Sequence, residues 1–168
     1  LYALKGKRVS SQQLAENACY VEQEIIKERV GSQDQFHAAF GGLNTMTFKK
    51  NNISVEPLII SNSKKDQLNN SWMMFFTGIT RYADPLIEEQ VKKTNSAEND
   101  SKLDEMIKIV EEAKSLFSDS SDKSFIKELG ALMHANWEKK KQLSSKVSNE
   151  VIDNIYTKAI SAGAYGGK

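Results

Sequence analysis

Asp34 has the residue type and the surroundings of a catalytic acid or base. It lies in residues 31–40, which place a carboxylate in a Gly/Ser/Gln turn between a patterned helix and the pair Gly41 and Gly42. Loops that follow a rigid element are common positions for catalytic side chains. A carboxylate held within hydrogen-bond reach of a hydroxyl can accept its proton. The alternative is an aspartate that only caps a turn.

Glu22 is the second acid whose position suggests chemistry. The periodicity predicts a helix over residues 11–28, with Ser10 as its N-cap. Its apolar face is formed by Leu14, Ala15, Ala18, Cys19, Ile25 and Ile26. Glu22 falls on that face, where an acid must be paired, bound to a metal or placed at the edge of the core. Glu24 falls nearer the polar side of the same helix.

The composition limits the classes of partner. The chain has 168 residues, 39% of them hydrophobic and 27% charged, which is ordinary for a globular protein with one core or two small ones. Its formal net charge of +1 gives no global attraction to nucleic acid or anionic lipid, and no apolar run could span a bilayer. We therefore expect no nucleic-acid or membrane partner, and a cytoplasmic location with Cys19 reduced and buried.

The middle of the chain is expected to be extended. Residues 45–49 alternate polar and apolar, and residues 53–60 give a second strand interrupted by Pro57, so a hairpin is predicted. Residues 61–70 are polar and are the expected linker or domain seam. Residues 71–79 contain the apolar run 72–76, which predicts a strand buried on both faces.

Four helices are predicted after this strand. They cover about residues 84–94, 103–117, 125–137 and 148–162, with Ser148 as the last N-cap and Gly163 as the last stop. Lys139, Lys140 and Lys141 are expected to form a solvated helix end. The fold class is therefore α+β. One strand covered by four helices is too little β-structure to stand alone, so further strands are expected outside residues 1–168.

Three stretches of the sequence resemble the GHMP small-molecule kinases. "LAENACYVEQEIIKERVGSQDQFHAAFGGLN" is similar to the family segment with a metal-binding acid, a catalytic aspartate and Gly-Gly. "MMFFTGITRYA" resembles the start of the second domain, and "ISAGAYGGK" the turn before a glycine-rich loop. Within the family, these stretches are most similar to the sequences of the D-glycero-D-manno-heptose 7-phosphate kinase group. The two glycine-rich ATP loops would then lie outside this chain.

The resemblance implies a fold, an activity and cofactors. Residues 1–62 would be the end of an N-terminal, S5-like catalytic domain, and residues 63–168 most of the C-terminal GHMP domain. The parent protein would use ATP and Mg²⁺ to phosphorylate the anomeric hydroxyl of heptose 7-phosphate, and the fragment alone would be inactive. A second copy of the chain is a candidate partner.

The same resemblance assigns roles to residues. Asp34 would be the base and Glu22 the Mg²⁺ ligand, with Glu24 as the rival ligand. Ser32 and Gln33 would bind the sugar or hold the base, unless they are simple turn residues. Arg81 would bind the sugar phosphate, because arginine suits bidentate phosphate recognition, or would pair with a local acid.

Two other functions stay open from the sequence. One is a galactokinase- or fucokinase-like enzyme, whose substrate has no phosphate for Arg81 to bind. The other is a non-catalytic helical interaction module.

Overall fold

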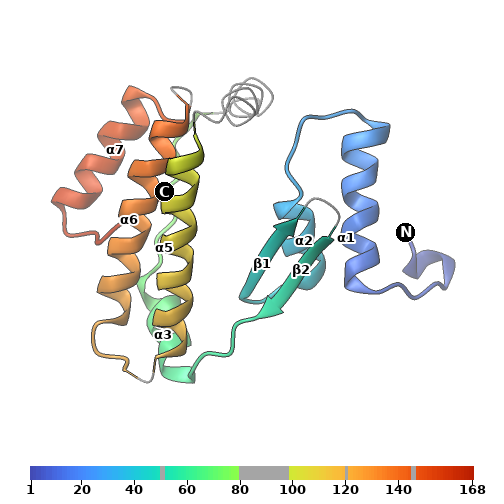
Figure 1. The fold of residues 1–168 in the computed structure, drawn as a ribbon, viewed down its shortest axis with the longest axis horizontal. Coiled ribbons are helices and arrows are strands. Elements are labelled where there is room, and N and C mark those ends of the chain that lie inside the picture. The colour runs from blue at the N-terminus through green and yellow to red at the C-terminus, as the bar shows by residue number, and fades with distance from the viewer. Residues whose placement is uncertain (50–51, 80–98, 120, 145–146) are drawn as a thin grey trace. The chain divides into compact units, whose positions relative to one another are not determined.

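The computed structural model describes residues 1–49, 52–79, 99–119, 121–144 and 147–168. These residues form helices and a two-stranded antiparallel sheet, so the composition is α+β and dominated by helix (Figure 1). The chain divides into two compact units, and the division falls between Pro57 and Leu58. The sequence placed a domain boundary after residue 62; the assignment of the two parts to an S5-like and a GHMP domain stays a prediction.

The first unit begins with a 3₁₀ turn, Ala3–Lys5, which ends at Gly6 with φ 65°. Helix α1 (Ser11–Tyr20) follows, and Oγ of Ser10 accepts a hydrogen bond from the backbone N–H of Gln13 at 3.1 Å. The predicted N-cap is therefore confirmed. The cap satisfies one of the backbone donors that every helix start leaves without an intrahelical partner.

Helix α1 continues into a π-helical turn, Val21–Ile25, and ends at Ile26 rather than at residue 28. A π turn holds one residue more than an α turn, so residues beyond it leave the apolar face predicted from α-helical spacing. Ala15 and Cys19 are buried as expected, but Ile25 and Ile26 are 61% and 57% exposed.

Helix α2 (Gln33–Phe40) corrects the loop expected over residues 31–40. Gly31 and Ser32 do form a turn before it. Asp34, however, lies in the first helical turn, so the candidate base stands on a regular element. Phe36, on the opposite side of α2 from solvent, is fully buried.

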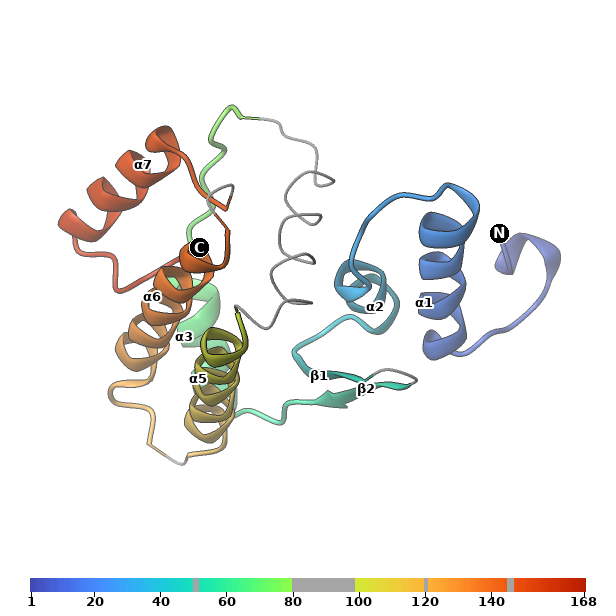
Figure 2. The same cartoon turned by 45° about the horizontal axis from the view of Figure 1, so that its top comes forward.

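Strands β1 (Asn44–Lys49) and β2 (Asn52–Pro57) form the predicted hairpin, with Met46 opposite Val55. The second strand ends at Pro57 and not at residue 60, because proline cannot donate to a ladder. The core of this unit comprises Ala15, Cys19 and Phe36, packed with Ala39, Phe40, Met46, Ile53 and Val55. The hairpin thus supports α2, and α2 packs against α1 (Figure 2).

In the second unit, helix α3 (Asn62–Ser71) occupies the segment predicted as a linker. Ser61 caps it by accepting from the N–H of Lys64. The Lys64 side chain is buried and donates to the carbonyls of Leu116, Phe117 and Asp119 at 2.7, 3.2 and 2.6 Å. Its Nζ lies 5.0 Å from the ring centre of Phe125. Helix α3 is polar, and it is held in place because its Lys64 caps the C-terminal end of α5.

Residues 72–76 are not the buried strand that the sequence predicts. They have no regular secondary structure and pair with no strand in the described part of the chain, and their side chains are exposed, up to 99% for Met74. The prediction rested on an apolar run. Such a run is buried in a sheet only if other strands pair with its edges and further elements cover both faces, and the described residues contain the β1–β2 hairpin alone as sheet.

Helices α5 (Asp100–Ser118), α6 (Phe125–Leu143) and α7 (Glu150–Ser161) confirm three predicted helices. Helix α5 packs along α6. The last N-cap is Asn149, which accepts from the N–H of Ile152 at 3.0 Å, and not Ser148, which donates instead to Asp153. Trp137 of α6 is buried.

The lysine run at the end of α6 forms ion pairs and is therefore not the fully solvated helix end that the sequence predicts. Lys139 pairs with Glu105 on α5, and Lys141 pairs with Glu138 at 2.8 Å. The pair to Glu105 links the two long helices, so part of the run contributes to the packing of α5 on α6.

Two sequence predictions fall outside the described residues: the helix over 84–94 and the position of Arg81. Of the helices in the described ranges, none has the length and apolar character needed to cross a membrane.

Candidate active site

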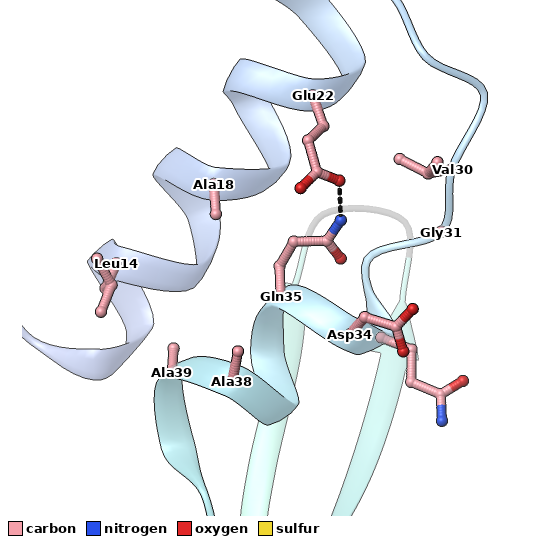
Figure 3. Close-up of a pocket in the computed structure, with 10 residues that line it drawn as sticks. Leu14, Ala18, Glu22, Val30, Gly31, Asp34, Gln35, Ala38 and Ala39 are labelled. Atoms are coloured by element: carbon pink, nitrogen blue, oxygen red, sulfur yellow. Dashed lines mark hydrogen bonds between the residues drawn. The ribbon is translucent and has the colours of Figure 1, made fainter.

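Glu22 and Asp34 line the same cleft in the first unit, which has a volume of about 640 Å³ (Figure 3). Glu22 comes from the π-helical turn after α1, and Asp34 from the first turn of α2. The walls between them are mainly small apolar side chains and backbone. The lining comprises Leu14, Ala18, Glu22, Val30, Gly31, Gln33, Asp34, Gln35, Ala38 and Ala39.

From the sequence, either Glu22 or Glu24 could be the Mg²⁺ ligand. The structure places the two carboxylates in different surroundings. Glu22 is half-buried and lines the cleft. Glu24 is exposed and is not among the lining residues. Two residues along a helix rotate a side chain by about 200°, so both acids cannot face α2.

Ser32 and Gln33 lie next to the candidate base. Gln33 is exposed and lines the cleft, whereas Ser32 is half-buried in the turn before α2. Oγ of Ser32 receives a hydrogen bond from Nε2 of Gln23 at 3.2 Å. Gln23 also donates to the carbonyl of Val30 at 3.0 Å. Ser32 therefore helps to fix the turn that carries Asp34.

Gln35 was not predicted from the sequence, although it contacts Glu22 directly. Its Nε2 donates a hydrogen bond to Oε2 of Glu22, and its side chain is 91% buried between α1 and α2. The sequence feature that could have identified Gln35 is its position immediately after Asp34. Its importance depends on a contact between residues 13 positions apart, which helix periodicity does not reveal.

The arrangement can bring a proton acceptor and a second carboxylate to one ligand. Asp34 is exposed and lies at a helix start, where the helix dipole stabilises negative charge. Glu22 offers a carboxylate oriented by Gln35. Within the described residues, no group of three or more His, Cys, Asp or Glu side chains could hold a metal ion by itself.

The two histidines stand apart from this cleft. His37 is exposed on α2. His134 stacks on Tyr156 with ring centres 5.8 Å apart, and its Nδ1 is hydrogen-bonded to the Tyr156 hydroxyl at 2.7 Å. His134 therefore takes part in the contact between α6 and α7.

Comparison with known proteins adds one relative. No family model matches the chain. The chain is 32% identical over 157 residues to the D-glycero-alpha-D-manno-heptose 7-phosphate kinase of Campylobacter jejuni subsp. jejuni serotype O:2. The match covers 93% of this chain and 45% of that protein, so the chain spans just under half the length of its curated relative. Along nearly its whole length, therefore, the chain is similar to a heptose 7-phosphate kinase, as its motifs predicted.

Proposed function

We propose that the protein containing this chain is a GHMP-type kinase that transfers the γ-phosphoryl group of ATP to the anomeric hydroxyl of D-glycero-D-manno-heptose 7-phosphate. The observation that carries the proposal is the cleft in which Glu22 and Asp34 meet. The similarity to a heptose 7-phosphate kinase supports the substrate. The substrates of this kinase are soluble, which fits a cytoplasmic enzyme.

Asp34 acts as the general base in this proposal. Its carboxylate takes the proton from the anomeric hydroxyl as the hydroxyl oxygen bonds to the γ-phosphorus. The bond from that phosphorus to the β–γ bridging oxygen breaks, and ADP leaves with the bonding electrons. Such a base contributes roughly 10²–10⁴-fold, and the rest of the acceleration comes from positioning and charge neutralisation.

Glu22 would hold Mg²⁺ at the cleft. The donor set fits this ion, because Mg²⁺ takes one or two protein carboxylates and completes its shell with phosphate oxygens and water. When bound, Mg²⁺ would neutralise charge on the transferred phosphoryl group. The protein's part is to orient the Glu22 carboxylate, which the hydrogen bond from Gln35 does.

Three further residues are proposed to contact the substrate. Gln33 and Ser32, beside the base, would contact sugar hydroxyls. Arg81 would bind the 7-phosphate, and a galactokinase- or fucokinase-like enzyme would have no such phosphate to bind. Arg81→Ala should therefore raise KM for heptose 7-phosphate and leave KM for ATP nearly unchanged.

The test is phosphotransfer by the full-length protein. ATP, Mg²⁺ and heptose 7-phosphate are incubated with it, and ³¹P NMR follows a new anomeric phosphate. Asp34→Asn should lower kcat by about 10²-fold or more, while Asp66→Asn, an exposed change on α3, should not. If Asp34→Asn retains kcat, Asp34 is not the base. If no sugar is phosphorylated, the kinase proposal falls and the interaction module becomes the better reading.

A further inference from the structure

Gln35 has one end of its side-chain amide bound and the other end free. Nε2 donates to Glu22, whereas the buried Oε1 has no hydrogen-bond partner in the part of the chain that the structure describes. Figure 3 shows this amide between Glu22 and Asp34, with its nitrogen turned toward Glu22. Gln35 also lines the cleft, so its side chain forms part of the candidate site.

Glu22 determines which end of the amide is free. An ionised carboxylate has only acceptors, so it must face the NH₂ group of Gln35 and would repel the carbonyl. The opposite flip of the amide is thereby excluded, and the atom left over is an acceptor. A buried acceptor without a donor is costly, and nearly all such groups in proteins have one.

A ligand rich in O–H groups would supply the missing donor. The titratable side chains that line the cleft are Glu22 and Asp34, both acceptors when ionised, and the described lining contains no Lys, Arg or His. A sugar suits these walls, because its hydroxyls can donate to the oxygens of the Glu22, Asp34 and Gln35 side chains, and its C–H faces can contact small apolar side chains of the lining. Since Asp34 must touch the reacting hydroxyl, the ring would lie beside the next residue, Gln35.

We infer that Gln35 is a specificity-determining residue that accepts a hydrogen bond from one non-anomeric hydroxyl of the sugar while it holds Glu22 in place. The inference rests on the proposed kinase function. It goes beyond that function in assigning a sugar contact to a residue outside the predicted site.

The experiment pairs a side-chain deletion with substrate deletions in the full-length protein. Gln35→Met keeps the length and volume of the side chain but removes both polar ends. Deoxy analogues of heptose 7-phosphate, each lacking one non-anomeric hydroxyl, are compared with the parent sugar by kcat/KM. The wild type should lose about 10- to 100-fold on the analogue that lacks the contacted hydroxyl, the scale of one buried hydrogen bond. Gln35→Met should use that analogue and the parent sugar equally well.

A matched control is available on α1. Gln12 also donates its amide to a glutamate, Glu16, at 2.7 Å, but it lies outside the cleft. Gln12→Met should discriminate among the analogues as the wild type does. Should Gln35→Met unfold, Gln35→Asn, which retracts the amide by one methylene, replaces it with the same expected loss of discrimination.

The outcomes separate the two proposals. If the wild type turns over heptose 7-phosphate but Gln35→Met still discriminates among all analogues as the wild type does, the inference is wrong and the kinase function stands. If Gln35→Met changes only the half-saturating Mg²⁺ concentration, Gln35 acts through Glu22 alone and the sugar contact is wrong. If the wild type phosphorylates no sugar phosphate, the function fails and the inference fails with it.

Discussion

The side-chain amide of Gln23 donates a hydrogen bond to Oγ of Ser32 at 3.2 Å and so ties the π-helical turn beside Glu22 to the turn before Asp34. The same amide donates to the carbonyl of Val30 at 3.0 Å. The two candidate acids come from separate elements, and Gln23 is one of the side chains that hold those elements in register. It touches no reacting atom in the proposed mechanism, so it is a positioning residue.

Removing this amide should loosen the site before it unfolds the protein. Gln23→Ala deletes two part-buried hydrogen bonds, each contributing about 0.5–1.5 kcal/mol to the free energy of unfolding. We expect a modest fall in Tm together with a larger fall in kcat than in substrate affinity. Calorimetry and steady-state kinetics check both. Gln13→Ala, an exposed change on α1, is the control and should alter neither. An unchanged kcat in Gln23→Ala would contradict the positioning role.

Glu22 and Glu24 should differ in their effect on the Mg²⁺ requirement. Glu22→Gln removes the carboxylate in the cleft, so the half-saturating Mg²⁺ concentration should rise on the order of 10- to 100-fold. Glu24→Gln should shift it far less, because Glu24 is exposed outside the lining. Phosphotransfer measured against Mg²⁺ concentration distinguishes them. A larger effect of Glu24→Gln would make Glu24 the ligand.

Lys64 should dominate the stability of the second unit. Lys64→Met keeps the aliphatic stem but leaves the carbonyls of Leu116, Phe117 and Asp119 without their shared donor. The free energy of unfolding should fall by at least about 1.5–3 kcal/mol, the scale of one hydrogen bond to a charged group. Urea unfolding measures it, with Lys65→Met, an exposed neighbour, as the control. Equal effects of the two substitutions would rule out the cap.

Tyr156 should make stability fall in alkali. Burial, assisted by the charge of Glu138, raises the pKa of the Tyr156 hydroxyl above its ordinary value of 10.0. The unfolded state then loses its proton first, so the stabilising contribution is complete below pH 10.0 and is lost as pH rises through the folded pKa. Tyr156→Phe should lower Tm at neutral pH, because the hydrogen bond to His134 is lost, yet reduce the decline of Tm above pH 10.

Melting curves between pH 8 and about 11, across the ordinary range of tyrosine titration, provide the comparison. Tyr20→Phe, an exposed tyrosine of α1, is the control and should follow the wild-type curve. A variant Tyr156→Phe whose Tm falls as steeply as the wild type would show that another group causes the alkaline loss.

The elements that the sequence predicted well are those with a clear apolar period. Helices α5, α6 and α7 each repeat apolar residues at helical spacing, and the hairpin sequence alternates polar and apolar residues. In these segments the local pattern and the observed secondary structure agree, which is what makes periodicity informative. Cys19 was placed in the interior for the same reason, and it is buried.

The misplaced elements depend on contacts between distant residues. Helix α3 has no apolar stripe, and its one deeply buried side chain is a lysine whose partners lie more than 50 residues away. The run 72–76 has strand composition, but strand pairing needs a neighbour that composition does not supply. The π turn after α1 likewise moves the side chains of Ile25 and Ile26 off the apolar face, and their residue types do not indicate this change.

The candidate site also contains residues that the sequence predicted and residues that it did not. Glu22 was selected from the sequence because it is an acid on an apolar helix face, and Asp34 mainly because its segment resembles a GHMP motif; the structure places both on one cleft. Gln23 and Gln35 are common polar residues in a helical pattern, and only the approach of α2 to α1 reveals what they hold. Their roles, like those of the two acids, stay predictions until the variants are measured.

The lysine cap at the end of α5 also bears on the order in which the second unit folds. Its hydrogen bonds close loops of 52, 53 and 55 residues. Closing such a loop costs conformational entropy, which the hydrogen bonds of Lys64 offset only if their acceptor carbonyls are already in place. These carbonyls are in place once α5 has formed up to its end at Ser118. The hairpin of α5 and α6 forms from local contacts and should be structured in the folding transition state, whereas α3 should dock after it. Lys64→Met would then speed unfolding and leave the folding rate nearly unchanged.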